Sequence, residues 1–206
     1  SSYPDTASGE GQSYLEQYYD VLSGSYPQEE TDLALIVDEH NQVDSAVLTA
    51  LGFDSDAESI SFADIVGREY KLIYNDDYYV KAGQYFTING TPDDLSALYD
   101  SENAVTLRIC GIARIKQDVT ISPLSGAVVY SDSLAKSFIE NAAASEIVEA
   151  QTDADYNVLT GGLFAEDGSV TGGIMGGSSS SGLQTKENVL AYLGATSVPS
   201  SISLYP

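Results

Sequence analysis

The sequence predicts an α+β fold with a mixed, mostly antiparallel sheet and several short helices. Hydrophobic residues make up 43% of the 206 residues and charged residues 19%, which is a globular composition. Apolar runs of strand length alternate along the chain with short stretches of helical spacing, and tight turns separate several of them. The length suffices for one sizeable domain, or for two small ones that share a core.

Composition shifts along the chain indicate four regions. We expect a flexible lead over 1–10 and an α+β core over 11–160. A Gly/Ser-rich loop without periodicity follows over 161–184, and we expect it to be mobile. The stretch 185–206 is then predicted to return to the core as a helix and a strand.

The first half of the core is predicted to alternate helices with a buried strand. The expected elements are a helix over 12–24, a buried strand over 33–38, a helix over 41–52 and a short helix or turn over 61–67. In the first helix the residues at helical spacing are Leu15, Tyr18, Tyr19 and Leu22. Gly24 suits the end of that helix, Gly52 the left-handed cap of the second, and Ser61 an N-cap.

The second half is predicted to be richer in strands. Strands are expected over 69–75, 78–88, 104–115, 145–151 and 198–206, and the stretch 122–131 is expected to turn and end in a short strand. Helices are expected over 91–100, 131–145 and 185–194. Asp76-Asp77 would turn a hairpin between the first two strands, and Pro92 would start the helix after them. Gly111 indicates a bulge or a close backbone approach.

The core is expected to depend on apolar positions in these elements, namely Leu35, Val37, Leu107, Ile109, Leu134 and Phe138. Truncation of such a buried leucine to alanine costs about 2–5 kcal/mol. Cys110 is the single cysteine, so an internal disulfide is ruled out. Because it lies in an apolar run, we predict a buried, inert thiol.

The charge balance excludes some classes of partner. Lys and Arg number 8 against 31 Asp and Glu, which gives a net charge of −23. Binding to nucleic acid depends on basic side chains that displace counterions, so nucleic acid is excluded as a partner. The same charge disfavours docking on an anionic membrane and favours solubility and cationic partners. No apolar run reaches the roughly 20 residues that span a bilayer.

The sequence carries none of the common catalytic or cofactor motifs, so we predict no catalytic residue, no cofactor and no metal. His40 beside Asp38 and Glu39 could serve as a general base, but we favour a solvated turn histidine. One His and one Cys cannot close a zinc site. The Gly-rich stretch lacks the phosphate-binding pattern, because Leu183-Gln184 follows its last glycine.

Some acidic clusters have the residue types of cation or glycosidase sites. Asp54, Asp56 and Glu58 alternate as in a calcium loop, but Ser59 and Ile65 stand where glycine and a bidentate glutamate are needed. We therefore expect a solvated acidic turn over 54–58. Paired carboxylates arise by chance among 31 acids and carry little weight; they are Asp76-Asp77, Asp93-Asp94 and Asp153/Asp155. The formal glycosylation sequon Asn89-Gly90-Thr91 is interpreted as a turn.

Several segments follow one another in an order that forms a recognisable pattern. A Gly-x-x-Pro turn precedes an acidic residue, an apolar strand and a helix that ends in Leu-Gly (YYDVLSGSYPQEETDLALIVDEHNQVDSAVLTALG). The segments ADIVGREYKLI, LRICGIAR and SGAVVYSDSLAKSFIENAAASEIVEAQ follow, and LAYLGATSVPSSISLYP closes the pattern. Together they cover about 14–151 and 187–206, and they resemble the extracellular domain of MacB/FtsX-like ABC-transporter permeases, of the Gram-positive type. Ser25 departs from the family, where many relatives have arginine, and 161–182 matches no part of it.

The resemblance implies a domain at the extracellular face of the cell membrane, between the first and second transmembrane helices of a permease. Such permeases pair as homodimers with a cytoplasmic ATPase and move their extracellular domains mechanically, so the domain binds an extracellular substrate or partner and is not an enzyme. We expect the loop over 161–182 and the acidic turn over 54–58 to contact this substrate or partner. The chain begins without Met, and we expect targeting signals and membrane helices to lie outside it. One alternative is a secreted adhesin or carbohydrate-binding module, which the 15 tyrosines favour. The other alternative is a hydrolase that uses His40.

Overall fold

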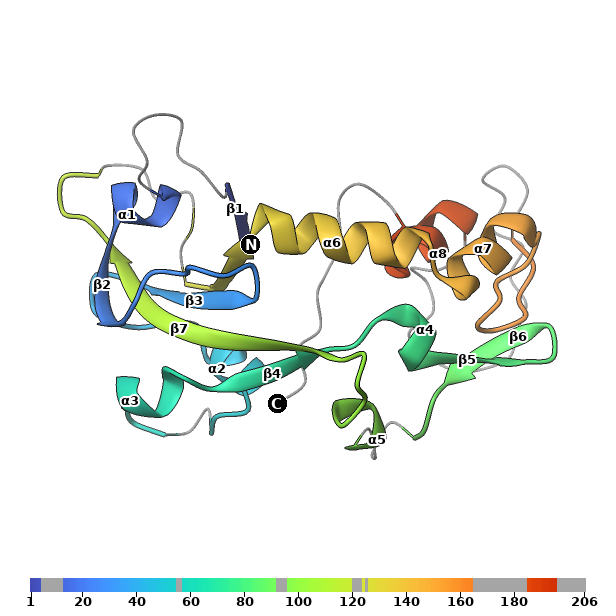
Figure 1. Cartoon of the computed structure of the whole chain (residues 1–206), viewed down its shortest axis with the longest axis horizontal. Helices are drawn as coiled ribbons and strands as arrows, with labels where there is room; N and C mark the ends of the chain where they lie inside the picture. Colours follow the sequence, from blue (N-terminus) through green and yellow to red (C-terminus); the bar gives the residue numbers. More distant parts are fainter. Residues whose placement is uncertain are drawn as a thin grey trace. The chain divides into compact units, whose positions relative to one another are not determined.

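The computed structural model describes residues 1–4, 13–54, 57–91, 96–119, 124, 126–164 and 185–195. Within these ranges, short helices and mixed, mostly antiparallel strands give the α+β fold that the sequence predicts (Figure 1). The chain divides into two compact units. Unit 1 takes in 1–72 and 105–136, and unit 2 takes in 73–104 and the described residues from 137 onwards.

Unit 1 is built around a six-stranded sheet. Its strands are β1 (Ser2–Tyr3), β2 (Tyr19–Gly24), β3 (Asp32–Val37), β4 (Glu69–Leu72), β7 (Val105–Ile115) and β8 (Val128–Ser131). They follow the order β1-β8-β3-β7, and the other side of β7 pairs with both β4 and β2 (Figure 1). β4 takes the first part of β7 and β2 takes the last part, both antiparallel. β7 is therefore paired along both of its edges.

The predicted irregularity at Gly111 is confirmed. Where β3 and β7 run parallel, Leu33 lies opposite Ile109 and Ala34 lies opposite Gly111. Cys110 is thus an extra residue on β7, as in a β-bulge. The predicted strand over 104–115 is confirmed with this bulge inside it.

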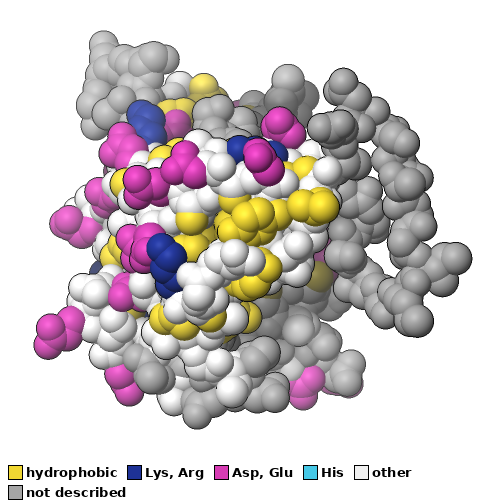
Figure 2. Space-filling view, turned by 90° about the vertical axis from the view of Figure 1, so that its right-hand side faces the viewer, with side chains coloured by type: hydrophobic (Ala, Val, Ile, Leu, Met, Phe, Trp, Pro, Cys, Tyr) yellow, Lys and Arg dark blue, Asp and Glu magenta, His cyan; other side chains and the backbone are white. Residues whose placement is uncertain are grey.

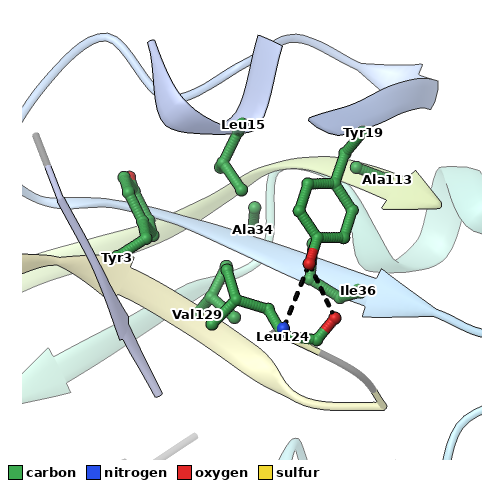
Figure 3. Packing of buried hydrophobic residues seen from close by; sticks show 8 residues of the cluster. All are labelled: Tyr3, Leu15, Tyr19, Ala34, Ile36, Ala113, Leu124 and Val129. Atoms are coloured by element: carbon green, nitrogen blue, oxygen red, sulfur yellow. Dashed lines mark hydrogen bonds between the residues drawn. The ribbon is translucent and has the colours of Figure 1, made fainter. Parts of the chain in front are cut away.

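β3 is the buried strand that the sequence predicts, and its six positions are all buried. Because successive side chains alternate, Ala34 and Ile36 point to one face of the sheet. There they pack against Leu15 of α1 (Tyr14–Tyr18) and Val129 of β8 (Figure 3). Burial on both faces explains why this run is apolar throughout.

The opposite face of the sheet carries Leu35 and Val37, which border a hollow together with α2 (Ser45–Ala50) and α3 (Phe62–Ile65). The predicted caps of these helices are confirmed. Gly52 has φ +75° after α2, and the Ser61 hydroxyl accepts a hydrogen bond from the Ala63 amide at the start of α3. α2 is shorter than the predicted 41–52, because Asp44 caps it.

The predicted helix over 12–24 is wrong in its second half. The helix begins at a capping box between Ser13 and Glu16 and ends at Tyr18, and the chain continues as β2. β2 pairs with β7 from Tyr19 opposite Ile115 to Gly24 opposite Gly111. Pairing with a distant strand overrides the local helical spacing.

Unit 2 contains a two-stranded ribbon and short helices. They are α4 (Asn75–Tyr78), β5 (Tyr79–Ala82), β6 (Tyr85–Ile88), α5 (Ser96–Tyr99), α7 (Glu146–Asp153) and α8 (Lys186–Tyr192). α6 (Asp132–Ala143) belongs to both units, since the division falls after Lys136. The buried cluster of unit 2 consists of Phe86, Ile147, Val148, Val158, Val189 and Leu193.

The predicted hairpin at Asp76-Asp77 is wrong. These residues lie in α4, and β4 pairs with β7 instead. The hairpin forms within the second apolar run, where Ala82 lies opposite Tyr85. Its two-residue loop begins with Gly83 at φ +70°, a position that glycine adopts without strain.

The predicted strand over 145–151 is also wrong, because this stretch forms α7. Ile147, Val148 and Gln151 are buried at helical spacing. The Gln151 side chain donates to the Tyr156 carbonyl oxygen at 2.9 Å and accepts from the Val158 amide at 3.0 Å. The helix thereby holds the turn that follows it.

Other predictions are confirmed where the structure describes them. β8, α6 and α8 form within their predicted ranges, and α5 forms within the predicted helix over 91–100. Five of the six expected core residues are buried; they are Leu35, Val37, Leu107, Ile109 and Leu134. Phe138 is half-buried, with its ring 6.5 Å from that of Tyr74.

Some predictions lie partly or wholly outside the described residues. The strand over 198–206, Pro92 and the loop beyond Phe164 fall there. Within the predicted lead 1–10, Ser2–Tyr3 form β1 parallel to β8, and Tyr3 is buried. No helix in the described ranges combines the length and apolar character needed to cross a bilayer.

Candidate functional site

Three distant segments of unit 1 meet at the middle of β7. The Ser25 amide donates to the Cys110 carbonyl oxygen at 2.9 Å, and the Gly67 amide donates to the Ile109 carbonyl oxygen at 2.7 Å. A Cβ on Gly111 would lie 2.1 Å from the Ser25 carbonyl oxygen. Only glycine leaves room for this approach, which the sequence predicts at Gly111.

Asp32 closes the turn that leads into β3. Its Oδ2 accepts hydrogen bonds from the amides of Gln28 at 2.9 Å and Glu29 at 3.1 Å. Its Oδ1 lies 3.5 Å from Nη2 of Arg108 on β7. Asp32 is buried, so these partners compensate a charge that would otherwise be costly to bury. The sequence pattern places an acidic residue before this strand, but it predicts neither the burial of Asp32 nor its contacts.

His40 lies in an exposed turn, as the sequence predicts. Its side chain is 71% exposed, and Nε2 lies 3.6 Å from Oε1 of Glu39. The Asp38 carboxylate accepts from the amides of His40 at 2.9 Å and Gln42 at 2.7 Å, so this carboxylate holds the turn. Within the described ranges no three His, Cys, Asp or Glu side chains converge as metal ligands would.

Cys110 is buried, as predicted, with Sγ 3.5 Å from the Ser25 carbonyl oxygen. Burial raises the pKa of this thiol to about 11, and the neighbouring Asp32 carboxylate contributes to the increase. The thiolate is the nucleophilic form of cysteine, so this shift makes the group inert at neutral pH.

The acidic pairs have separate partners. Asp76 Oδ1 accepts from the Glu146 amide at 2.8 Å and so caps α7 from a distant part of the chain. Asp77 Oδ1 accepts from the Asn103 side chain at 3.0 Å. Asp153 and Asp155 are exposed, and Asp93-Asp94 lie outside the described residues.

The sequon at Asn89 lies in a bend after β6, in agreement with its interpretation as a turn. The Asn89 side chain donates to the Asp77 carbonyl oxygen at 3.0 Å, and its amide donates to the Tyr78 carbonyl oxygen at 2.7 Å. The next residue, Gly90, has φ +116°. These contacts fix the end of the ribbon.

The acidic turn 54–58 borders the hollow on the α2–α3 face of the unit 1 sheet. Asp54 and Glu58 are exposed, and Asp56 lies outside the described residues. The hollow has a volume of about 300 Å³; Leu35 and Val37 form its buried part, and Glu58 is among its polar lining residues. The turn therefore adjoins a depression lined by both polar and apolar side chains, which the sequence did not predict.

Only 161–164 of the predicted contact loop are described, and they contribute to an apolar patch on unit 2. We define the apolar patch as Val80, Tyr85, Tyr156 and Leu163. Tyr85 and Tyr156 meet edge to face with ring centroids 5.8 Å apart, and Tyr156 pairs with Leu163 in an isolated β-bridge. Leu163 is 84% exposed. The sequence signal for this patch was limited to the high tyrosine content.

The chain was compared with family models, curated proteins and solved structures, and none matches it. The resemblance to permease domains therefore remains a prediction from the sequence.

Proposed function

We propose that the chain is the extracellular domain of an ABC-transporter permease of the MacB/FtsX-like kind. In this proposal it binds a substrate or partner outside the cell and couples mechanically to a cytoplasmic ATPase through membrane helices of the full-length protein. The permease would pair as a homodimer at the cell membrane. The domain itself would perform no bond chemistry.

The observation that carries the proposal is the meeting of three resembling segments around β7. The Gly-x-x-Pro turn at 24–27, the Gly67 strand entry and the 107–114 strand are far apart in sequence. They contact one another through the hydrogen bonds of Ser25 to Cys110 and of Gly67 to Ile109. The glycines that recur in the resemblance thus stand where the backbones approach or turn, which supports a shared fold.

The acidic residue of the same pattern also has a structural role. Asp32 holds the turn before β3 and reaches Arg108, which belongs to the 107–114 segment. The turn held by this buried carboxylate and the strand that it reaches both lie within the resembling segments.

The two-unit organisation suits a mechanical role. β7 is paired along both edges, and close-packed, fully bonded elements transmit displacement with little deformation. Unit 2 offers an exposed apolar patch on which a partner could be recognised. The proposal therefore assigns force transmission to the sheet of unit 1 and recognition to unit 2.

Cysteine labelling in intact cells tests the location. In the full-length protein, Cys110→Ala removes the buried thiol, and Glu187→Cys adds an exposed one on α8. A membrane-impermeant maleimide should label the variant in intact cells. The protein with its native Cys110 alone should stay unlabelled, because that thiol is buried. Labelling that requires permeabilised cells would contradict an extracellular location.

Co-purification tests the coupling. The full-length protein, extracted in mild detergent, should bring down a nucleotide-hydrolysing subunit from its own cells and stimulate or restrain its ATPase rate in nanodiscs. Replacing the 206 residues with a short linker should leave the subunit bound and abolish the effect of the domain on the rate. A full-length protein without membrane helices or ATPase would end the proposal.

One observation favours the alternative of a carbohydrate-binding module. The Tyr85 hydroxyl lies 2.6 Å from the Gln84 side-chain amide, so an exposed aromatic ring stands beside a polar group, as in sugar platforms. A glycan array probed with the isolated chain distinguishes the two. Specific binding that Tyr85→Ala removes would favour the module.

A further inference from the structure

The apolar patch on unit 2 combines unusual exposure with fixed geometry. Leu163 is 84% exposed, Val80 39% and Tyr85 38%. Single exposed apolar side chains are common on protein surfaces, whereas several on adjoining segments indicate a contact surface. Figure 2 views the side of the molecule on which β5, β6 and α7 lie, and hydrophobic side chains gather there.

The register of the ribbon explains the exposure. Val80 lies opposite Thr87, and Ala82 lies opposite Tyr85. Because opposite residues, and residues two apart on one strand, point to the same face, Val80 and Tyr85 share one face of the ribbon. Phe86 points to the other face and is buried in the core of unit 2. The ribbon therefore cannot bury Tyr85 without exposing Phe86.

The turn after α7 continues this surface. The Phe86 amide donates to the Val158 carbonyl oxygen at 2.9 Å, which sets the turn beside β6. A Cβ on Gly161 would lie 3.2 Å from the Tyr85 ring, so turn and ring are in contact. Leu163 follows two residues later and pairs with Tyr156.

Hydrogen bonds fix the patch before any partner binds. The Tyr156 hydroxyl donates to the Gln84 carbonyl oxygen at 3.2 Å. The Asn157 side chain accepts from the amides of Leu159 at 2.9 Å and Thr160 at 3.2 Å. A surface ordered in advance loses little conformational entropy on binding.

The charge around the patch indicates the chemistry of its partner. Apart from Lys81 and Lys186, every charged residue in the described part of unit 2 is Asp or Glu. Lys81 is itself paired with Glu146 at 2.9 Å. Acidic side chains thus dominate the charge of the described part of the unit that carries the patch, and such a surface complements apolar side chains flanked by basic ones.

The same charge disfavours the other occupants. Two copies of a chain with net charge −23 repel each other, and so do this chain and an anionic lipid surface. We therefore infer that the apolar patch docks a basic amphipathic segment of a partner polypeptide, in which aliphatic side chains are flanked by Lys and Arg. This inference specifies the partner of the proposed function and rests on it.

Peptide binding to the 206-residue chain tests the inference. The probe is a fluorescein-labelled amphipathic helix of Leu and Lys, measured by fluorescence anisotropy. Leu163→Ser should weaken its binding by at least about tenfold, as expected for a central contact residue. Because Leu163 is almost fully exposed, this variant should keep its unfolding midpoint, and Val80→Ser provides a second variant on the ribbon.

Matched controls separate the patch from charge alone. Tyr192 is 57% exposed on α8 and lies outside the patch, so Tyr192→Ser should leave the peptide affinity unchanged. A peptide with Glu in place of Lys should not bind. No loss in either variant would show attraction by charge only, and equal losses in Leu163→Ser and Tyr192→Ser would show contacts that are not specific to the patch; each result would overturn the inference.

Other occupants would appear as distinct results. A dimer in analytical ultracentrifugation that Leu163→Ser dissociates would assign the patch to a second copy. Peptide binding that appears only after deletion of 165–184 would assign it to the chain's own segment. Either result overturns the inference. Loss of binding in Leu163→Ser together with an intracellular labelling pattern would keep the docking surface and reject the permease function.

Discussion

The phenol of Tyr19 holds Leu124 by both of its backbone groups. The hydroxyl donates to the Leu124 carbonyl oxygen at 2.9 Å and accepts from the Leu124 amide at 3.1 Å (Figure 3). Tyr19 is fully buried at the start of β2, and Leu124 belongs to the same core cluster. A single side chain therefore satisfies two polar groups in an apolar core.

Removal of this hydroxyl should destabilise unit 1. Tyr19→Phe removes both hydrogen bonds to Leu124, and a hydrogen bond of this kind contributes about 0.5–1.5 kcal/mol to stability. We expect a loss of about 2 kcal/mol in the free energy of unfolding, measured by urea denaturation. Tyr192→Phe, at an exposed site, should change it little; an equal loss in both variants would contradict the role of Tyr19.

Gly111→Ala should be among the most disruptive small substitutions. The new Cβ would lie 2.1 Å from the Ser25 carbonyl oxygen, so β2 or β7 would have to move. We expect a loss of about 3 kcal/mol or more, or failure to fold, in thermal and urea unfolding. Gly162→Ala is the control, because its Cβ would meet only the Thr160 hydroxyl at 3.4 Å. Similar stabilities for the two variants would refute the close approach.

Asp32 should contribute more to stability than its partner Arg108. Asp32→Ala leaves the amides of Gln28 and Glu29 without their acceptor and should cost about 3 kcal/mol. The Arg108 side chain is 55% exposed, so Arg108→Met should cost less than about 1 kcal/mol. Chemical denaturation of both variants measures the difference. The reverse order would mean that the ion pair, and not the turn, is the stabilising element.

The Cys110 thiol should make stability depend on pH in the alkaline range. Its pKa rises from an ordinary value of 9.0 to about 11 on folding, mainly through burial. Below pH 9 the thiol keeps its proton in both the folded and the unfolded chain, so the full contribution of the thiol to the free energy of unfolding is present. Between pH 9 and about 11 the unfolded chain releases its proton first, so the contribution falls, by roughly 2 kcal/mol over this window.

Urea denaturation at several pH values measures this loss. Burial also raises the pKa of Tyr70 and Tyr130, and both remain in a Cys110→Ala variant. The difference in unfolding free energy between native chain and variant should therefore shrink from pH 8.5 to pH 10.5. A constant difference would show that the thiol titrates alike in both states. The thiol should also react with a maleimide at pH 7 only after unfolding.

The sequence by itself determined the elements whose signals are local. β3 is apolar at each position because both of its faces are buried, and Gly52 and Ser61 cap their helices by chemistry that needs only near neighbours. The extra residue beside Gly111 was visible as a glycine inside an alternating strand. The net charge of −23 likewise follows from the composition alone.

Tertiary structure decided the elements whose partners are distant. Tyr19–Gly24 has helical spacing but forms a strand, because the edge of β7 supplies the hydrogen bonds. Glu146–Asp153 has the composition of a short strand but forms a helix, capped by Asp76 and buried against the core of unit 2. The apolar patch likewise depends on the register that turns Phe86 inward and Tyr85 outward. Local propensities differ by about 1 kcal/mol or less per residue, so pairing and burial between distant segments outweigh them.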